Sequence, residues 1–226
     1  MFEQQLTHGN HLAYMRADRT IYLPQFEALL LSDLHLGKCS TFRQAGIYVP
    51  GGVVEATLAR WSAALERQPV SDCYILGDLI HSFDSLSSSV APLVSDWMTS
   101  QAVRFHLIRG NHDCATVEDL RQLPLSSIQT SVELGEWRLQ HYPVEQPDAS
   151  AQLVVCGHLH PGLRLPKQFG RRVQVPCFVV EPHQWITPAF GEFTGLADAN
   201  QNRTPGCQLI AACEGELVVL GQACKV

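Results

Sequence analysis

Four short polar clusters along the chain carry side chains that can bind divalent metals. They are Asp33-Leu34-His35, Gly77-Asp78, Gly110-Asn111-His112-Asp113 and Gly157-His158-Leu159-His160. Each cluster alone has an ordinary structural explanation, because glycine, aspartate and asparagine are common in turns. Four such clusters in this order are difficult to explain as turns, and two histidines separated by one residue rarely serve packing. Their carboxylate, amide and imidazole groups suit manganese, iron, zinc or cobalt.

This mixture of ligands is typical of a site that hydrolyses phosphate esters with two metal ions. Such a site holds two cations about 3.5–4 Å apart, activates a hydroxide for attack on phosphorus and neutralises charge on the phosphate oxygens. One carboxylate has to bridge the two cations. The sequence therefore predicts two divalent metal ions as cofactors, manganese first, with iron, zinc or cobalt as alternatives.

The clusters follow apolar segments that are expected to be strands and to hold them rigidly. Strands are predicted at His11–Met15, Thr20–Leu23, Ala28–Leu31, Cys73–Leu76, Val103–Ile108, Trp137–Gln140, Leu153–Cys156, Val173–Val175, Phe178–Val180, Gln208–Ala212 and Leu217–Leu220. Apolar residues at helical spacing predict one helix at Val53–Gln68 and a second from Val90 to Trp97.

The order of these elements is β-α-β-α-β in the first half of the chain and mostly strand in the second half. This order predicts an α/β fold, a layered αββα sandwich of two mixed sheets with helices outside. No repeat or linker divides the chain, so residues 1–226 are expected to form a single domain. The clusters lie at the carboxyl ends of strands, which is the edge where open α/β sheets bind ligands.

The composition fits a globular protein in a reducing compartment. Hydrophobic residues make up 46% and charged residues 17%, which excludes a disordered chain. The eight cysteines are scattered without a Cys-x-x-Cys pair, and the polar first ten residues do not resemble a signal peptide, so we expect free thiols in the cytoplasm. No apolar run approaches the roughly 20 residues that span a bilayer. The net charge of −6 argues against binding nucleic acid by surface charge alone, but two bound cations would add about four positive charges at the site.

Taken together, the clusters resemble the signature of the calcineurin-like metallophosphoesterase superfamily. The resemblance implies that Asp33, His35 and His160 bind the first metal and that Asn111, His141 and His158 bind the second. It also implies that Asp78 bridges the two metals. His141 is assigned by its order and its position after a predicted strand; the alternative is a surface histidine at a strand end. The resemblance also implies that His112 binds the substrate phosphate and protonates the leaving oxygen as general acid, and that Asp113 orients His112.

Longer motifs resemble the DNA ligase-associated metallophosphoesterases, over nearly the whole chain. These motifs are Ser32-Asp33-Leu34-His35-Leu36-Gly37-Lys38, Gly77-Asp78-Leu79-Ile80-His81-Ser82 and Pro188-Ala189-Phe190-Gly191-Glu192-Phe193-Thr194-Gly195. That family is identified as a DNA-damage-response endonuclease, found with an ATP-dependent DNA ligase and a helicase, so the resemblance implies DNA as substrate and these two proteins as partners. His81 is usual in the family, although the broader superfamily has an acidic residue there, and it is expected either to support the ligands or to contact substrate. Tyr142 replaces the glutamate that commonly follows the late histidine.

Basic and aromatic side chains near the clusters are candidates for binding substrate. Lys38, Arg43 and Arg109 flank the clusters, and arginine can pair with phosphate oxygens. Arg171 and Arg172 belong to a basic stretch with Arg164 and Lys167, which reads equally as a track for a nucleic-acid backbone or as a solvated hairpin loop. Trp185, Phe190 and Phe193 would stack on bases or fill the core.

Three functions fit these residues. The first is a nuclease or phosphodiesterase that acts on DNA in repair. The second is a phosphoesterase for small nucleotides or other phosphorylated metabolites. The third is a scaffold that kept the fold and lost the chemistry, and this function comes last because every expected ligand is present.

Overall fold

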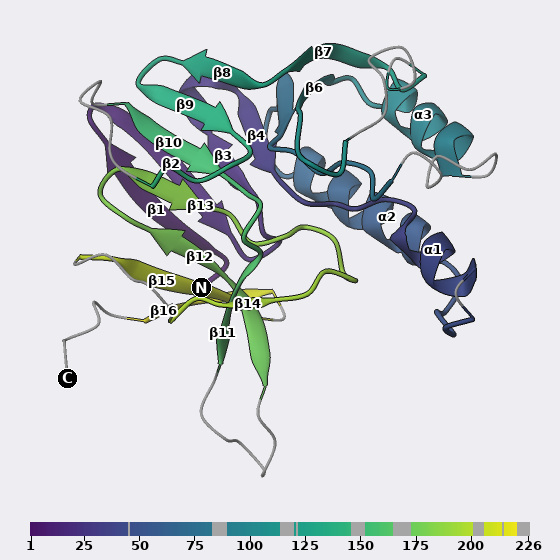
Figure 1. Cartoon of the computed structure of the whole chain (residues 1–226). Coiled ribbons are helices and arrows are strands. Elements are labelled where there is room, and N and C mark those ends of the chain that lie inside the picture. The colour runs from purple at the N-terminus through teal and green to yellow at the C-terminus, as the bar shows by residue number, and fades with distance from the viewer. Residues whose placement is uncertain are drawn as a thin grey trace.

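The described residues form a two-layered β-sandwich with helices packed on one side. The structure is a computed structural model that describes residues 1–44, 46–82, 90–113, 120, 122–145, 152–164, 173–200, 206–213 and 215–220. Figure 1 shows the two sheets facing each other, with the helices gathered beyond the first sheet. The predicted α/β fold with two mixed sheets is confirmed.

The first sheet has seven strands among the described residues, in chain order. They are β1 (Glu3–His8), β2 (His11–Arg16), β3 (Ile21–Leu23), β4 (Ala28–Leu31), β5 (Asp72–Ile75), β6 (Arg104–Ile108) and β7 (Leu125–Gln129). Neighbours from β1 to β4 pair antiparallel, whereas β4, β5, β6 and β7 pair parallel. The parallel half therefore brings the carboxyl ends of its strands to one edge, as the sequence predicted.

The second sheet has nine described strands and is built mainly from the second half of the chain. They are β8 (Ser131–Leu134), β9 (Trp137–Gln140), β10 (Leu153–Cys156), β11 (Pro161–Arg164), β12 (Gln174–Val180), β13 (Gln184–Ile186), β14 (Ala197–Asp198), β15 (Gln208–Cys213) and β16 (Glu216–Leu220). At its centre β9, β10 and β13 run parallel. The carboxyl ends of β9 and β10 thus also meet at one edge.

Among the described residues the helices are α1 (Lys38–Gln44), α2 (Val53–Glu66) and α3 (Val90–Ser100), besides the 3-10 turn η1 (Pro24–Phe26). Of these, α2 and α3 cover the outer face of the first sheet. Trp61 of α2 and Val94 of α3 are fully buried in one apolar cluster with strand residues such as Phe105. No described helix contributes to the apolar cluster on the outer face of the second sheet. In the described part of the chain, helices therefore flank one sheet and not both.

A separate apolar cluster fills the space between the two sheets. Leu30 and Ile108 of the first sheet meet Trp137, Val155 and Phe178 of the second sheet, all of them fully buried. Burying large apolar side chains stabilises such a layer by roughly 1.5–3 kcal/mol each. This inner core fixes the distance between the sheets.

The strands differ from the prediction where apolar runs are short or interrupted. Val173–Val175 and Phe178–Val180 were expected as two strands, but β12 runs through Pro176 and changes partner there, from β11 to β15. A proline without an N–H is tolerated at such a point. Elements without an apolar pattern were missed: they are β1, β7, β8, β11, β13, β14 and α1.

Two expectations from composition can be compared with the described residues. Six cysteines are described and none of them forms a disulfide, as expected. No described helix is long and apolar enough to cross a membrane.

Candidate metal centre

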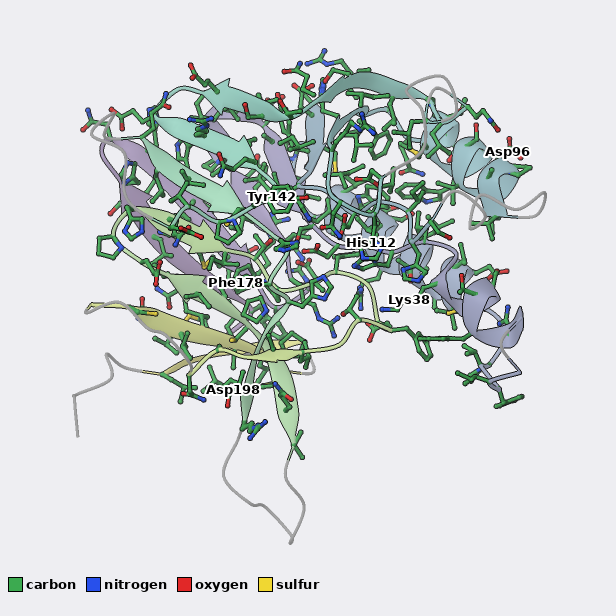
Figure 2. The ribbon with its side chains drawn as sticks, in the orientation of Figure 1. Lys38, Asp96, His112, Tyr142, Phe178 and Asp198 are labelled. Carbon is green, nitrogen blue, oxygen red and sulfur yellow. The ribbon has the colours of Figure 1, made fainter. Side chains whose placement is uncertain are left out.

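The edge where both sheets end brings the predicted ligands together. Asp33 follows β4, Asp78 follows β5 and Asn111 follows β6, while His141 follows β9 and His158 follows β10. Figure 2 shows His112 near this edge, between the sheets and α1. Among the described residues, three groups of side chains that could hold a metal form there; one of them is His35, His81 and His112, and the other two each draw on both sheets.

The first group consists of Asp33, His35, Asp78 and His160. One ligand atom from each lies within 4.8 Å of the others. The Nε2 atom of His160 lies 3.2 Å from Oδ1 of Asp33 and 3.2 Å from Nε2 of His35. Three of these side chains are almost completely buried, so a cation in their midst would be shielded from bulk water.

The second group consists of Asp78, His141 and His158, with Asn111 beside it. Nδ1 of His158 lies 3.2 Å from Nε2 of His141. Oδ1 of Asn111 lies 3.1 Å from the same Nε2 atom. The second group therefore offers two imidazole nitrogens, a carboxylate and an amide oxygen around one point.

Asp78 is the one residue that both groups share. Its Oδ2 atom lies 3.7 Å from Nε2 of His35, and its Oδ1 atom lies 3.6 Å from Nε2 of His141. The backbone N–H of His112 donates to Oδ1 at 2.9 Å and fixes the carboxylate. Each oxygen of this carboxylate thus faces a different group, which is the arrangement that a bridging ligand requires.

A hydrogen bond to the backbone orients the imidazole of His141. Its Nδ1 atom lies 2.9 Å from the carbonyl oxygen of Leu76. A carbonyl oxygen only accepts, so Nδ1 donates to it and Nε2 is the atom that faces the other ligands. The oxygens of Asn111 and Asp78 lie 3.1 and 3.6 Å from Nε2. Imidazole, amide and carboxylate atoms that converge on one point suit a divalent cation, so this donor set fits a metal.

Burial favours the neutral, metal-binding form of two of these imidazoles, His35 and His158. Burial, with a smaller contribution from the neighbouring His160, lowers the pKa of His35 to about 3. Burial also lowers the pKa of His158. For Asp33, burial acts to raise the pKa, but the hydrogen bond and the charge of His160 outweigh it and the pKa is lowered. Metals bind deprotonated ligands, so these directions favour binding.

The backbone around the ligands is strained in a regular way. Seven described non-glycine residues have positive φ, and five of them belong to the two groups: Asp33, His35, Asp78, His158 and His160. Their φ angles lie between 46° and 70°. Such conformations each cost on the order of 1–3 kcal/mol and persist where a functional site requires them. One residue of ordinary φ separates the two members of each pair: Leu34 lies between Asp33 and His35, and Leu159 between His158 and His160. Both members of each pair turn toward the site.

Glycines next to the ligands leave the space that those side chains occupy. A Cβ atom on Gly77 would overlap the imidazole of His141, and one on Gly110 would overlap the carboxylate of Asp78. Gly77 also has a φ of 90°, which a side chain disfavours.

Replacing Gly77 by alanine should therefore displace His141 and weaken the second group. We expect Gly77→Ala to lose about one equivalent of bound metal and to reduce activity by about 10- to 100-fold. Gly215→Ala is the matched control, because Gly215 has a φ of 85° and no atom within 4 Å of the added Cβ. Elemental analysis and thermal unfolding of both variants separate displaced ligand from backbone strain. Equal metal content in both variants would contradict the expectation.

His112, the predicted general acid, lies beside the first group. Its ring packs edge-on against His35 at 4.7 Å between ring centroids and stacks on His81 at 5.1 Å. Nδ1 of His112 donates to the carbonyl oxygen of His81 at 2.8 Å. Its Nε2 atom is thereby left for the substrate side, where it can donate only when the imidazole is protonated.

Asp113 has a different position from the one implied by the resemblance. Its carboxylate accepts backbone N–H groups from Asp78 at 2.8 Å, Gly110 at 2.9 Å and Ile80 at 3.2 Å. None of its described contacts reaches the imidazole of His112, which the His81 carbonyl holds instead. Burial raises the pKa of Asp113 to about 6. Asp113 therefore ties the loops after β5 and β6 together, and it orients His112 only through the backbone.

The predicted substrate-binding cations occupy different surroundings. Lys38 begins α1, lies half-buried beside His35 along a small cavity, and has its pKa lowered by burial. The guanidinium of Arg109 donates to the carbonyl oxygen of Asp113 at 3.0 Å. Arg43 donates to the carbonyl oxygens of Val49 and Pro50, so it holds its own loop. Arg171 and Arg172 lie outside the described residues, and so does Lys167 of the same basic stretch.

One supporting element was not foreseen from residue types. The backbone N–H groups of Phe190 and Gly191 donate to the carbonyl oxygens of Ser32 and Asp33, at 2.8 and 3.1 Å. Arg60 pairs with Glu192 and donates to the Phe190 carbonyl, and so clamps this segment against α2. The motif that runs from Pro188 to Gly195 was the signal for this role. Phe190 and Trp185 are buried core residues, whereas Phe193 is 38% exposed.

Comparisons with known proteins agree with this geometry. Residues 27–140 match the family model of the calcineurin-like phosphoesterases. The crystal structure of the Pseudomonas putida nuclease MPE superposes with a TM-score of 0.80 and 32% sequence identity, covering 96% of this chain and 100% of that chain. A protein of unknown function from Aquifex aeolicus, AQ665, aligns with a TM-score of 0.41 and 20% identity over 59% of this chain and 78% of that one, which is too distant to support an argument. A search of curated proteins finds no significant match.

Proposed function

The chain belongs to the calcineurin-like phosphoesterases and is a metal-dependent hydrolase, and from this premise we propose that it is a phosphodiesterase that cleaves DNA. The observation that carries the proposal is the carboxylate of Asp78, whose two oxygens face two separate groups of ligands. Such a carboxylate fits a pair of cations better than a single one. The DNA substrate is supported by the likeness to the P. putida nuclease and by the ligase-associated motifs.

We assign the metal ligands as follows. The first cation would be held by Asp33, His35 and His160, the second by Asn111, His141 and His158, and both would share Asp78. When bound, the two cations would polarise the phosphate oxygens and lower the pKa of a water for attack on phosphorus. This set of oxygen and imidazole ligands suits manganese, with iron, zinc or cobalt as alternatives.

The remaining residues of the site would handle the substrate and the proton. Protonated His112 donates from Nε2 to the leaving oxygen, while the His81 carbonyl holds its Nδ1–H. Lys38 adds positive charge beside the first group, where it would attract a phosphate oxygen. Arg109, Arg171 and Arg172 would contact the nucleic-acid backbone. His81 would position His112 from one side by stacking on its ring.

The wider setting of this activity follows from the motifs. We place it in DNA repair in the cytoplasm, with a DNA ligase and a helicase as partners that bring substrate to an acidic enzyme. The net charge of −6 supports weak binding of free DNA, because the 22 acidic residues outnumber the 16 lysines and arginines.

A screen of metals and substrates tests the proposed function. The purified protein is stripped with a chelator and assayed with manganese, zinc, magnesium or no metal. The substrates are single- and double-stranded DNA, cyclic nucleotides, an aryl phosphate monoester and an aryl phosphate diester. We expect cleavage of DNA that disappears on chelation and returns with manganese, because each cation supplies charge neutralisation that no side chain replaces.

Competition gives this screen its control. DNA in excess should inhibit hydrolysis of the aryl diester if both bind at one site. An enzyme that cleaves the aryl diester well, but neither cuts DNA nor is inhibited by it, would contradict the DNA proposal and favour a small phosphoester. A protein that binds two metals and cleaves none of these substrates would favour a scaffold.

A further inference from the structure

An exposed tyrosine lies directly beside the second group of ligands. Tyr142 follows His141, and 48% of its surface is exposed to solvent. We propose that Tyr142 is a stacking platform for one nucleobase of the substrate. This inference rests on the proposed function, because it adds a subsite to the same reaction.

The ring of Tyr142 is held in place by the two imidazoles of that group. Its centroid lies 4.8 Å from the ring of His141 and 4.8 Å from the ring of His158, at interplanar angles of 74° and 62°. The carbonyl oxygen of Tyr142 accepts a hydrogen bond from Nε2 of Gln140 at 2.5 Å, which anchors the backbone. A ring that is already fixed loses little entropy when a second aromatic ring packs on it.

The surroundings of Tyr142 favour an aromatic, uncharged part of the substrate. The first group has Lys38 beside it, where negative charge is attracted. The side chain next to the second group's imidazoles is a neutral aromatic ring. Figure 2 shows Lys38 and Tyr142 on opposite sides of His112. A phosphate bound over the two groups would therefore have the positive charge of Lys38 on one side. On the other side it would have the ring of Tyr142, next to the nucleoside attached to that phosphate.

A nucleobase matches this position by its chemistry. Stacking of a base on an aromatic side chain tolerates every base, because each base offers a π-face. The subsite would thus strengthen binding of nucleic acid without reading its sequence. A phosphate ester without an aromatic base would gain nothing from it.

Matched esters that share one leaving group test the subsite. The thymidine 5′- and 3′-p-nitrophenyl phosphates carry a nucleoside, and methyl p-nitrophenyl phosphate carries a methyl group in its place. The measured quantity is the ratio of kcat/KM for the better thymidine ester to kcat/KM for the methyl ester, with manganese present. We expect Tyr142→Ala to lower this ratio about 5- to 100-fold, from the usual size of base stacking. Tyr142→Phe keeps the ring and should keep the ratio within about twofold.

A second tyrosine provides the matched control. Tyr48 is 88% exposed, lies after α1 and belongs to neither group, so Tyr48→Ala should leave the ratio as in the wild type. An unchanged ratio in Tyr142→Ala would overturn the stacking platform. So would an equal loss on both esters together with loss of metal, because Tyr142 would then only support the ligands.

The wild-type enzyme separates this failure from failure of the proposed function. A wild type that prefers the thymidine ester and cuts DNA, with Tyr142→Ala keeping that preference, overturns the subsite alone. A wild type that hydrolyses the methyl ester, has no preference for the thymidine esters and leaves DNA intact overturns the proposed function and the subsite with it.

Discussion

Replacing Asp78 by asparagine is expected to remove both metals and to reduce activity to the level of the chelated enzyme. Asparagine has the same size, but its amide offers one neutral oxygen where Asp78 offers two charged ones. The carboxylate faces His35 with one oxygen and His141 with the other, so both groups lose their shared ligand at once. Substitution of any ligand that served one cation alone would leave the second cation in place.

The protein should remain folded, because its stability depends on burial of apolar side chains in three clusters. Elemental analysis of the purified variant, together with its circular dichroism, measures metal and fold in one preparation. Asp96→Asn is the matched control, since Asp96 is exposed on α3 away from the strand ends, as Figure 2 shows. Two bound metals with normal turnover in Asp78→Asn would refute the bridge.

Replacing His112 by alanine is expected to keep both metals and to slow cleavage of DNA by about 10²–10⁴-fold. The alkoxide that leaves from DNA needs a proton, which the imidazolium of His112 would supply from Nε2. A p-nitrophenolate leaves without that help, so an aryl diester should lose much less rate. The difference between the two substrates is the diagnostic result.

The control for this variant is another histidine in an ordinary setting. His11 begins β2 and packs near Phe26, so His11→Ala should retain activity on both substrates. Equal losses of His112→Ala on DNA and on the aryl diester would point to phosphate binding in place of proton transfer. Loss of one metal would make His112 a ligand.

Two strands that position the site were predictable because their sequences are short, continuous apolar runs. Ala28–Leu31 and Leu153–Cys156 coincide with β4 and β10, whereas Trp137–Gln140, which coincides with β9, alternates apolar and polar residues. Runs of this kind are buried on both faces, and their parallel pairing puts the following polar residues at one edge. The sequence therefore predicted which residues would gather there.

Contacts that depend on backbone atoms were beyond the sequence. The three N–H groups that hold the Asp113 carboxylate come from separate loops, and nothing in residue type predicts them. The residue type of Arg43 is compatible with pairing to a phosphate or to backbone carbonyls. In the structure its guanidinium donates to the carbonyl oxygens of its own loop. β1 was missed because Glu3–His8 is polar and lies at an edge, where water faces much of the strand.

The inner core between the sheets determines how far apart the ligands on the two sheets lie. Asp33 and Asp78 stand on the first sheet, His141 and His158 on the second, and each group combines residues from both. The thickness of the layer that contains Trp137 and Phe178 would thus set the distance between the two proposed cations. Interiors are close-packed, so a change in the volume of these core side chains would shift the two sheets relative to each other. The same change would shift the ligands that stand on those sheets, which ties the packing of the interior to the geometry of the proposed metal centre.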